Sequence, residues 1–203
     1  MADPSSDTRK RILDVTIKLS SESGFAGVSI RKIARGVGIK ESSLYNHFQS
    51  KEALLNAALD EAEREFCSLT LPSDAIEGMI SGNRPEEFLR KGLNRYKGHW
   101  NDPRMSRVWI LMEMEQYRSE RVASIILRET DRIIRFNETV FKMMIERGLV
   151  KPFNARFLAE LFSRTMLSLH GDYALSILHK RPPDEIEQRM VAWIRHFVDL
   201  ISR

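Results

Sequence analysis

Apolar residues recur along most of the chain at intervals of three and four positions, which places them on one face of an α-helix. Glycine and proline stand between these periodic stretches, and strand-like alternation is hard to find. The pattern therefore predicts an all-α fold. The expected helices cover about 6–24, 30–37, 40–47, 50–68, 85–100, 103–117, 119–147, 154–180 and 183–202, with a short amphipathic stretch at 74–80 and a boundary near 71–74.

Local signals mark the ends of the first helices. Ser29 and Ser50 are suitable N-caps, and Gly24 and Gly38 are suitable residues after a helix C-terminus. The second and third helices are too short to be stable alone and must pack on the first. The tight turn at 35–39 predicts a helix-turn-helix. Its expected core is Ile12, Leu19, Phe25, Val28, Ile33, Leu44, Tyr45 and Phe48.

Positive charge is concentrated at the N-terminal end of the chain. The net charge of the whole chain is +4. Residues 1–51 hold nine Lys and Arg against five Asp and Glu, and the remainder holds 23 of each. A segment that meets a polyanion is expected to carry such an excess. A solvated basic surface would give the same count.

The third helix has an exposed polar face that can meet DNA. Base edges and phosphates are within reach of such short or polar side chains when the helix enters a major groove. The residues of this face are Lys40, Glu41, Ser42, Ser43, Asn46 and His47.

Residues 8–55 resemble the DNA-binding domain of the tetracycline-repressor (TetR) family of bacterial regulators. The matching elements are Ile12-Leu13, Gly24-Phe25, Ser29-Ile30-Arg31-Lys32-Ile33-Ala34, Val37-Gly38-Ile39, Leu44-Tyr45-Asn46-His47-Phe48 and Ser50-Lys51-Glu52. They cover about a quarter of the chain and are specific in combination. The resemblance implies a helix-turn-helix DNA-binding domain at 1–52, a linking helix at about 50–68, and a ligand-binding and dimerisation domain at 53–203.

Site residues follow from the resemblance position by position. It implies that Ser42, Ser43 and Asn46 face base edges, that Tyr45, His47 and Lys51 contact phosphates, and that Ser29 and Arg31 support them. Tyr45 could instead be a core aromatic, and His47 a packing histidine. Lys40 stands where the family often has a small capping residue, so either Lys40 points at phosphate or base, or Glu41 alters what the helix reads.

The rest of the chain resembles nothing as specific. The family resemblance implies a helical bundle with an internal ligand cavity and a dimer interface made by the last two helices. Apolar stripes on those helices favour a two-fold contact, and the alternative is that they face only the chain's own core. The interface candidates are Leu158, Phe162, Leu169, Met190, Trp193, Phe197 and Ile201.

Methionine and aromatic residues make a flexible apolar surface suited to a ligand, although any one of them could be ordinary core. The ligand-binding candidates are Trp100, Trp109, Met112, Met114, Tyr117, Phe141, Met144, Met166 and His170. Glu113 and Glu115 lie in an otherwise apolar run. A buried carboxylate would hint at a cationic ligand, but we expect solvated helix positions for both, because burying an unpaired charge is costly.

Other function classes find little support. No segment has the ~20 consecutive apolar residues that span a bilayer, and the polar, acidic N-terminus is unlike a signal peptide. Cys67 is the single cysteine, and no catalytic or metal-binding motif stands out. We therefore expect a cytoplasmic protein that is not an enzyme and has neither metal nor cofactor.

The function expected from these features is a homodimeric, ligand-responsive repressor. It would bind a palindromic operator in double-stranded DNA and be released by an unknown, largely apolar small-molecule effector. The alternative is a helical dimer that serves as a ligand-binding or protein-interaction module with little DNA binding.

Overall fold

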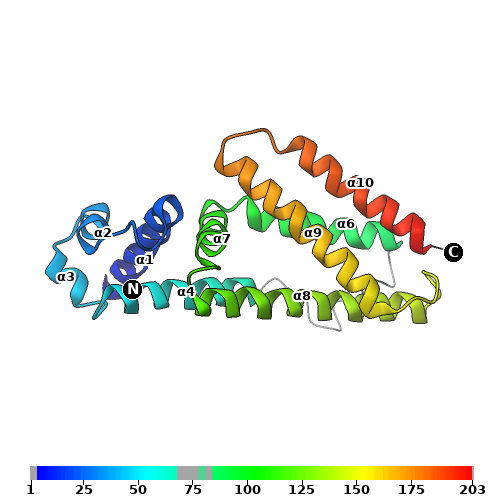
Figure 1. Cartoon of the computed structure of the whole chain (residues 1–203), viewed down its shortest axis with the longest axis horizontal. Helices are drawn as coiled ribbons and strands as arrows, with labels where there is room; N and C mark the ends of the chain where they lie inside the picture. The colour runs from blue at the N-terminus through cyan, green and yellow to red at the C-terminus, as the bar shows by residue number, and fades with distance from the viewer. Residues whose placement is uncertain (1–3, 68–77, 79, 81–83, 203) are drawn as a thin grey trace. The chain divides into compact units, whose positions relative to one another are not determined.

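The computed structural model describes residues 4–67, 78, 80 and 84–202, and no strand occurs among them. The helices are α1 (Pro4–Ser23), α2 (Ile30–Val37), α3 (Glu41–Tyr45), α4 (Lys51–Cys67), α6 (Pro85–Trp100), α7 (Pro103–Glu115), α8 (Glu120–Glu146), α9 (Ala155–Leu178) and α10 (Asp184–Ile201) (Figure 1). The predicted all-α class is confirmed. The amphipathic stretch expected at 74–80 lies outside the described residues except for Gly78 and Ile80, and so does the boundary at 71–74.

The chain packs as two compact units. One consists of Met1–Cys67 with Asp102–Ile126, and the other of Ser68–Asn101 with Leu127–Arg203. The first unit thus contains α7 and the beginning of α8 in addition to α1–α4. A domain boundary at residue 52 stays a prediction. By its contacts, Asp102–Ile126 packs in the first unit, whereas the prediction placed this segment in the second domain.

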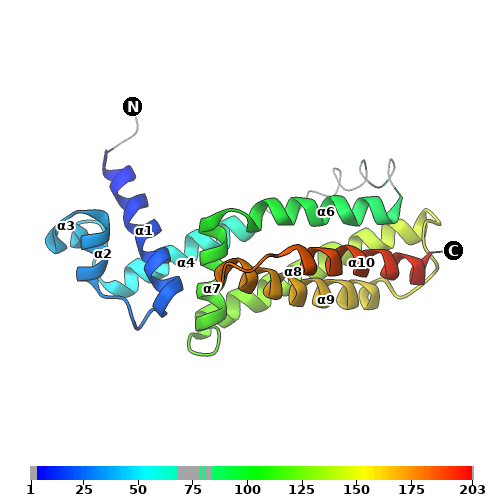
Figure 2. The same cartoon turned by 90° about the horizontal axis from the view of Figure 1, so that it is seen from above.

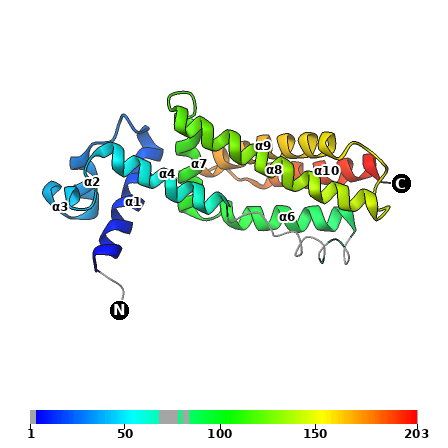
Figure 3. The same ribbon diagram turned by 90° about the horizontal axis from the view of Figure 1, so that it is seen from below.

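Helix α1 is the centre of the first unit, and it packs against α2, α4 and α7. Ile12, Ile33, Leu44 and Leu54 are fully buried there (Figure 3 shows α2 and α3 beside α1). A Cβ atom on Gly36 would lie 2.7 Å from Val15 Cγ1, so α2 approaches α1 more closely than a larger residue would permit.

The second unit is a bundle of α6, α9, α10 and the part of α8 from residue 127 onward, which run lengthwise along one another (Figures 2 and 3). Helix α10 packs against both α9 and α6. Phe141, Phe162 and Phe197 form an aromatic cluster at the core, with ring centroids 5.2 to 5.9 Å apart. Such offset contacts add to the stabilisation that comes from burying the rings.

Across the described parts of the chain, no helix combines the length and the hydropathy required to cross a lipid bilayer.

Candidate DNA-binding surface

The start of α2 is fixed by Ser29. Its backbone is extended, and its side-chain oxygen accepts a hydrogen bond from the backbone N–H of Lys32 at 3.3 Å. This bond satisfies one of the donors left open at a helix N-terminus. The N-cap predicted from the sequence is therefore present, and it determines where α2 begins.

The end of α2 is closed by Gly38, which has φ 80° in the left-handed region. Its N–H donates to the Ala34 carbonyl at 2.9 Å, and the N–H of Ile39 donates to the same oxygen at 3.0 Å. A glycine at this position avoids the Cβ strain that other residues would meet at this φ. The chain turns sharply here, and α3 starts only three residues later, at Glu41.

Helix α3 and the turn after it are anchored by two apolar side chains and expose most of their polar ones. Leu44 and Phe48 are buried, whereas Lys40, Glu41, Ser42 and Asn46 are exposed. Lys40 occupies the N-cap position without a side-chain cap hydrogen bond, as its chemistry requires. The Lys40 and Glu41 side chains have no hydrogen bond or ion pair with any described residue and are available to a partner.

Helix α3 is shorter than the 40–47 stretch expected from the sequence, because the chain passes into a turn after Tyr45. Tyr45 is 49% exposed, so its place in the predicted core was wrong. Ser43 and His47 are half-buried at the edge of the same surface. Ser29 and Arg31 are exposed on α2.

Helix α4 begins shortly after α3 in the sequence, at Lys51. Ser50 accepts the Ala53 N–H at 3.0 Å, which is the cap predicted for it, and Lys51 is the half-buried first residue of the helix. The guanidinium carbon of Arg9 stands 4.8 Å from the centre of the Phe48 ring, a cation–π distance. A lysine and the open N–H groups of a helix N-terminus both favour a phosphate.

Helix α7 is tied to the turn that follows α1. The Glu115 carboxylate accepts the backbone N–H of Phe25 at 2.9 Å and is only 6% exposed. The expectation of a solvated position was wrong for Glu115 and correct for Glu113, which is exposed. The carboxylate's partner is a backbone N–H, so its burial is no sign of a cationic ligand.

Two arginines add further links within the first unit. Arg104 on α7 pairs with Asp14 of α1 and with Glu61 of α4, each at 2.7 Å. Arg121 at the start of α8 donates to Asn56 of α4 at 2.6 Å and also pairs with Asp60. These contacts hold α1 and α4 against α7 and the first turn of α8.

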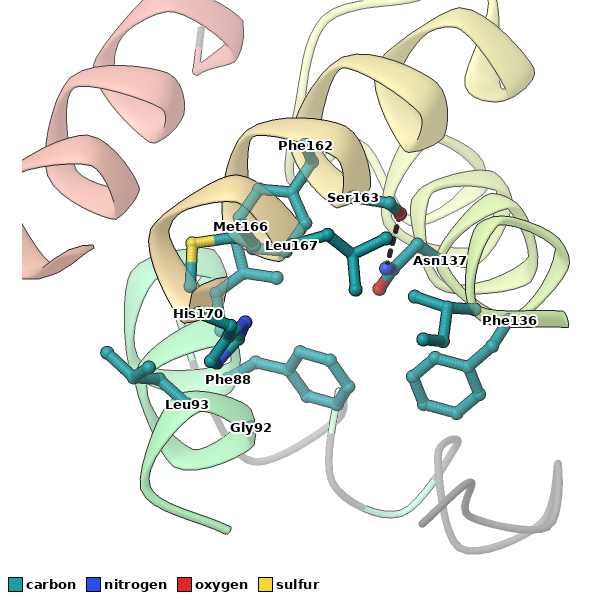
Figure 4. A pocket seen from close by; sticks show the side chains of 12 residues that line it. Phe88, Gly92, Leu93, Phe136, Asn137, Phe162, Ser163, Met166, Leu167 and His170 are labelled. Carbon is teal, nitrogen blue, oxygen red and sulfur yellow. Dashed lines mark hydrogen bonds between the residues drawn. The ribbon is translucent and has the colours of Figure 1, made fainter. Parts of the chain in front are cut away.

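The second unit contains a cavity with an empty volume of about 680 Å³, a figure that includes its opening to solvent (Figure 4). Helix α6 contributes Phe88, Leu89, Gly92 and Leu93, α8 contributes Ile133, Phe136 and Asn137, and α9 contributes Phe162, Ser163, Met166, Leu167 and His170. Ligand pockets in proteins are typically apolar hollows that hold few polar groups, and this wall has that character.

The structure brings only two of the predicted ligand-binding residues to this cavity, Met166 and His170. Phe141 and Met144 are buried elsewhere in the second unit. Trp109, Met112 and Met114 lie on α7 in the first unit, and Tyr117, which follows α7, is 91% exposed. The side chain of Trp100 lies outside the described residues. Sequence reasoning missed the other lining residues as ligand contacts. They include the aromatic Phe88 and Phe136, and also Gly92, Asn137 and Ser163, which are small or polar and lack the apolar signal used in the search.

Most of the predicted dimer residues are buried inside a single chain. Leu158, Phe162, Leu169, Met190, Phe197 and Ile201 all lack solvent exposure, and only Trp193 is half-exposed. These stripes pack against the chain's own core, which is the alternative noted for them. The large apolar residues exposed on α9 and α10 are Phe157, Leu175, Ile177, Leu178 and Leu200.

Residues 12–58 match the family model described as bacterial regulatory proteins, tetR family. The chain is 29% identical over 133 residues to the uncharacterized HTH-type transcriptional regulator YerO of Bacillus subtilis, a match that covers 64% of this chain and 45% of that protein. It is 31% identical over 91 residues to the class D tetracycline repressor protein of Escherichia coli, which covers 44% of this chain and 41% of that protein. The chain thus spans less than half the length of these two relatives.

Among solved structures, a TetR transcription regulator from Haloarcula marismortui shares the fold. It is 18% identical, the match covers 98% of this chain and 100% of that chain, and the TM-score is 0.69. At that identity the likeness concerns the fold alone. Residues 12–58, about a quarter of the chain, thus match the tetR family of bacterial regulatory proteins, which confirms the resemblance seen in the sequence.

Proposed function

We propose that the chain is a ligand-responsive transcriptional regulator that binds operator DNA through α3. The observation that carries the proposal is the row of exposed, unpaired polar side chains at the start of α3, on a short helix anchored by Leu44 and Phe48. The family match over 12–58 supports the same assignment. In this proposal Ser42, Ser43 and Asn46 read base edges.

Phosphate contacts would position the helix-turn-helix on the DNA duplex. Tyr45, His47 and Lys51 are the proposed phosphate-binding residues, with Ser29 and Arg31 beside them. Tyr45 and Arg31 are exposed, which agrees with this role. Phosphate contacts fix register and orientation, whereas sequence is read at the base edges.

A homodimer is part of the proposal. A palindromic operator requires a two-fold protein, whose two recognition helices would enter major grooves about 34 Å apart. Phe157, Leu175 and Leu200 are exposed apolar residues on α9 and α10, and they support a self-contact there better than the buried residues named from the sequence. We expect Phe157→Glu to shift the mass measured by light scattering from dimer to monomer.

Repression would be relieved through a population shift. An effector that binds one conformation of the dimer more tightly than the other moves the equilibrium toward the first. The effector site would be the cavity of the second unit. We assign the protein no enzymatic reaction and no cofactor, and place it in the cytoplasm, where the operator is.

Salt dependence tests DNA binding directly. Each phosphate neutralised by Lys or Arg releases counterions, so a dimer with several such contacts should lose affinity by roughly a thousandfold between about 50 and 200 mM salt. The measurement is fluorescence anisotropy with duplexes selected from a random pool. A flat salt profile, or no enriched sequence, would favour the alternative of a ligand-binding or protein-interaction module.

A further inference from the structure

The cavity of the second unit owes part of its space to a missing side chain. Gly92 lies on the α6 wall, and a Cβ atom built on it would have nothing within 4 Å. The neighbouring wall residues Phe88 and Leu93 are buried, so α6 is otherwise well packed at this level. The hollow at Gly92 can therefore receive part of a bound molecule.

The wall of the cavity is mainly apolar, with one hydrogen-bonded polar pair. The Asn137 side-chain N–H donates to the Ser163 hydroxyl oxygen at 2.9 Å, and both residues are buried (Figure 4). A carboxamide has two N–H donors and an acceptor oxygen, and the bond to Ser163 occupies one donor. The pair can thus meet a polar group of a ligand without first breaking its own bond.

No Asp, Glu, Lys or Arg is among the residues that form the described wall. Among the residues of this described wall, His170 is the one whose ordinary pKa lies near neutrality. Burial lowers the pKa of His170 from 6.5 to about 4, so its imidazole is uncharged at neutral pH. An ion placed in this cavity would lose its hydration and gain no opposite charge, which is strongly unfavourable.

We propose that this cavity binds an uncharged, mainly apolar molecule whose polar end hydrogen-bonds to Asn137 and Ser163. The inference rests on the proposed function in taking that molecule as the effector. It adds the charge of the ligand and the place of its polar group. The proposal predicts weaker binding of a carboxylate or a quaternary ammonium ligand, because neither finds an opposite charge on the described wall.

Three probes with the same eight-carbon tail test the charge. We would titrate 1-octanol, octanoate and octyltrimethylammonium into the full chain at neutral pH by calorimetry. Octanol should bind at least tenfold more tightly than either ion, since only the ions must be desolvated without a counter-charge. Equal or tighter binding of either ion would overturn the proposal.

Filling the hollow tests the site. Gly92→Leu should abolish octanol binding, and Gly92→Ala should weaken it less. Gly98→Leu is the matched control, because Gly98 is an exposed glycine on the same helix with nothing near its Cβ position. Unchanged octanol binding in both Gly92 variants, with folding verified by circular dichroism, would place the ligand elsewhere.

The polar contact is tested with a hydrocarbon. Asn137→Leu should weaken octanol binding roughly threefold to tenfold, as expected for one lost hydrogen bond, and leave binding of butylbenzene unchanged. An equal loss for both probes would mean that Asn137 only shapes the cavity. If none of the probes binds a protein that still binds DNA, the cavity assignment fails while the DNA-binding proposal stands.

Discussion

The carboxylate of Glu115 accepts the backbone N–H of Phe25, a residue 90 positions earlier in the chain, at 2.9 Å. Phe25 follows Gly24, whose φ of 68° lies in the left-handed region. A Cβ atom on Gly24 would stand 2.8 Å from the same Glu115 oxygen. The turn after α1 and the end of α7 are thus fitted to each other.

Removing this carboxylate should destabilise the first unit. Glu115→Ala leaves the Phe25 N–H without its acceptor and should lower the free energy of unfolding by about 1–3 kcal/mol. Glu115→Gln retains an acceptor oxygen and should lose much less. Urea unfolding followed by circular dichroism measures both.

Glu113→Ala is the control on the same helix, since Glu113 is exposed and its carboxylate accepts a hydrogen bond from the nearby Gln116. Its effect should stay within about 0.5 kcal/mol, as for other surface substitutions. If Glu113→Ala and Glu115→Ala destabilised the protein equally, the bond to Phe25 would contribute nothing specific.

The proposed DNA contacts predict two different phenotypes. Asn46→Ala should relax the preference at one base position by about 1–3 kcal/mol, because base-edge contacts carry sequence information. Lys51→Ala should weaken binding to all sequences alike and reduce the salt slope by about 1, because a phosphate contact carries no sequence information. Competition binding against single-base operator variants separates these effects.

Lys142 provides the matched lysine control, since it is exposed on α8 in the second unit and pairs with Glu138. Lys142→Ala should leave both affinity and salt slope unchanged. Normal operator binding by both the Asn46 and the Lys51 variants would remove α3 and the start of α4 from the interface.

The helix starts and the turn of the candidate DNA-binding surface could be predicted well because their signals are local. Ser29, Gly38 and Ser50 act within three or four residues of their own positions, so the turn and the helix starts can be read from short stretches of sequence. Tyr45 was misplaced because an aromatic residue next to a buried leucine fits the core as well as it fits a phosphate.

The contacts of Glu115 and the cavity could not be predicted in the same way. An apolar stripe shows that a helix face is buried but not what covers it, so Met112 was assigned to a ligand site although it packs in the first unit. The cavity depends on where side chains are absent, as at Gly92. A missing side chain gives no apolar signal in the sequence. It forms part of a cavity only when α6, α8 and α9 pack around it.

Glu41 should determine one base of the operator. A carboxylate on α3 is repelled by phosphates, and the partner it favours in the major groove is the amino group of cytosine. Selection from random duplexes should therefore yield a fixed cytosine that Glu41→Gln changes toward adenine, with a tenfold to hundredfold change in preference, about 1–3 kcal/mol. Glu22→Gln, on the exposed part of α1, is the control. A Glu41→Gln variant that binds every sequence more tightly, with unaltered preference, would show that Glu41 reads no base.

Stability should fall in mild acid because of His170. Burial lowers its pKa from 6.5 to about 4, so below pH 6.5 the unfolded chain takes up a proton that the folded chain does not. The neutral imidazole therefore contributes fully to the free energy of unfolding above pH 6.5, and this contribution is lost as the pH falls toward 4. The loss between about pH 7 and pH 5 should be roughly 2 kcal/mol per chain.

Denaturant unfolding at a fixed protein concentration and several pH values measures this loss. His170→Gln should flatten the pH dependence by that amount, whatever it does to the stability at neutral pH. His179→Gln removes an exposed histidine just after the same helix and should leave the dependence unchanged.

Identical pH profiles for the wild-type protein and His170→Gln would mean that His170 is accessible to protons in the folded state. The cavity would then be open enough to solvate a charged ligand, so this measurement also bears on the charge of the effector.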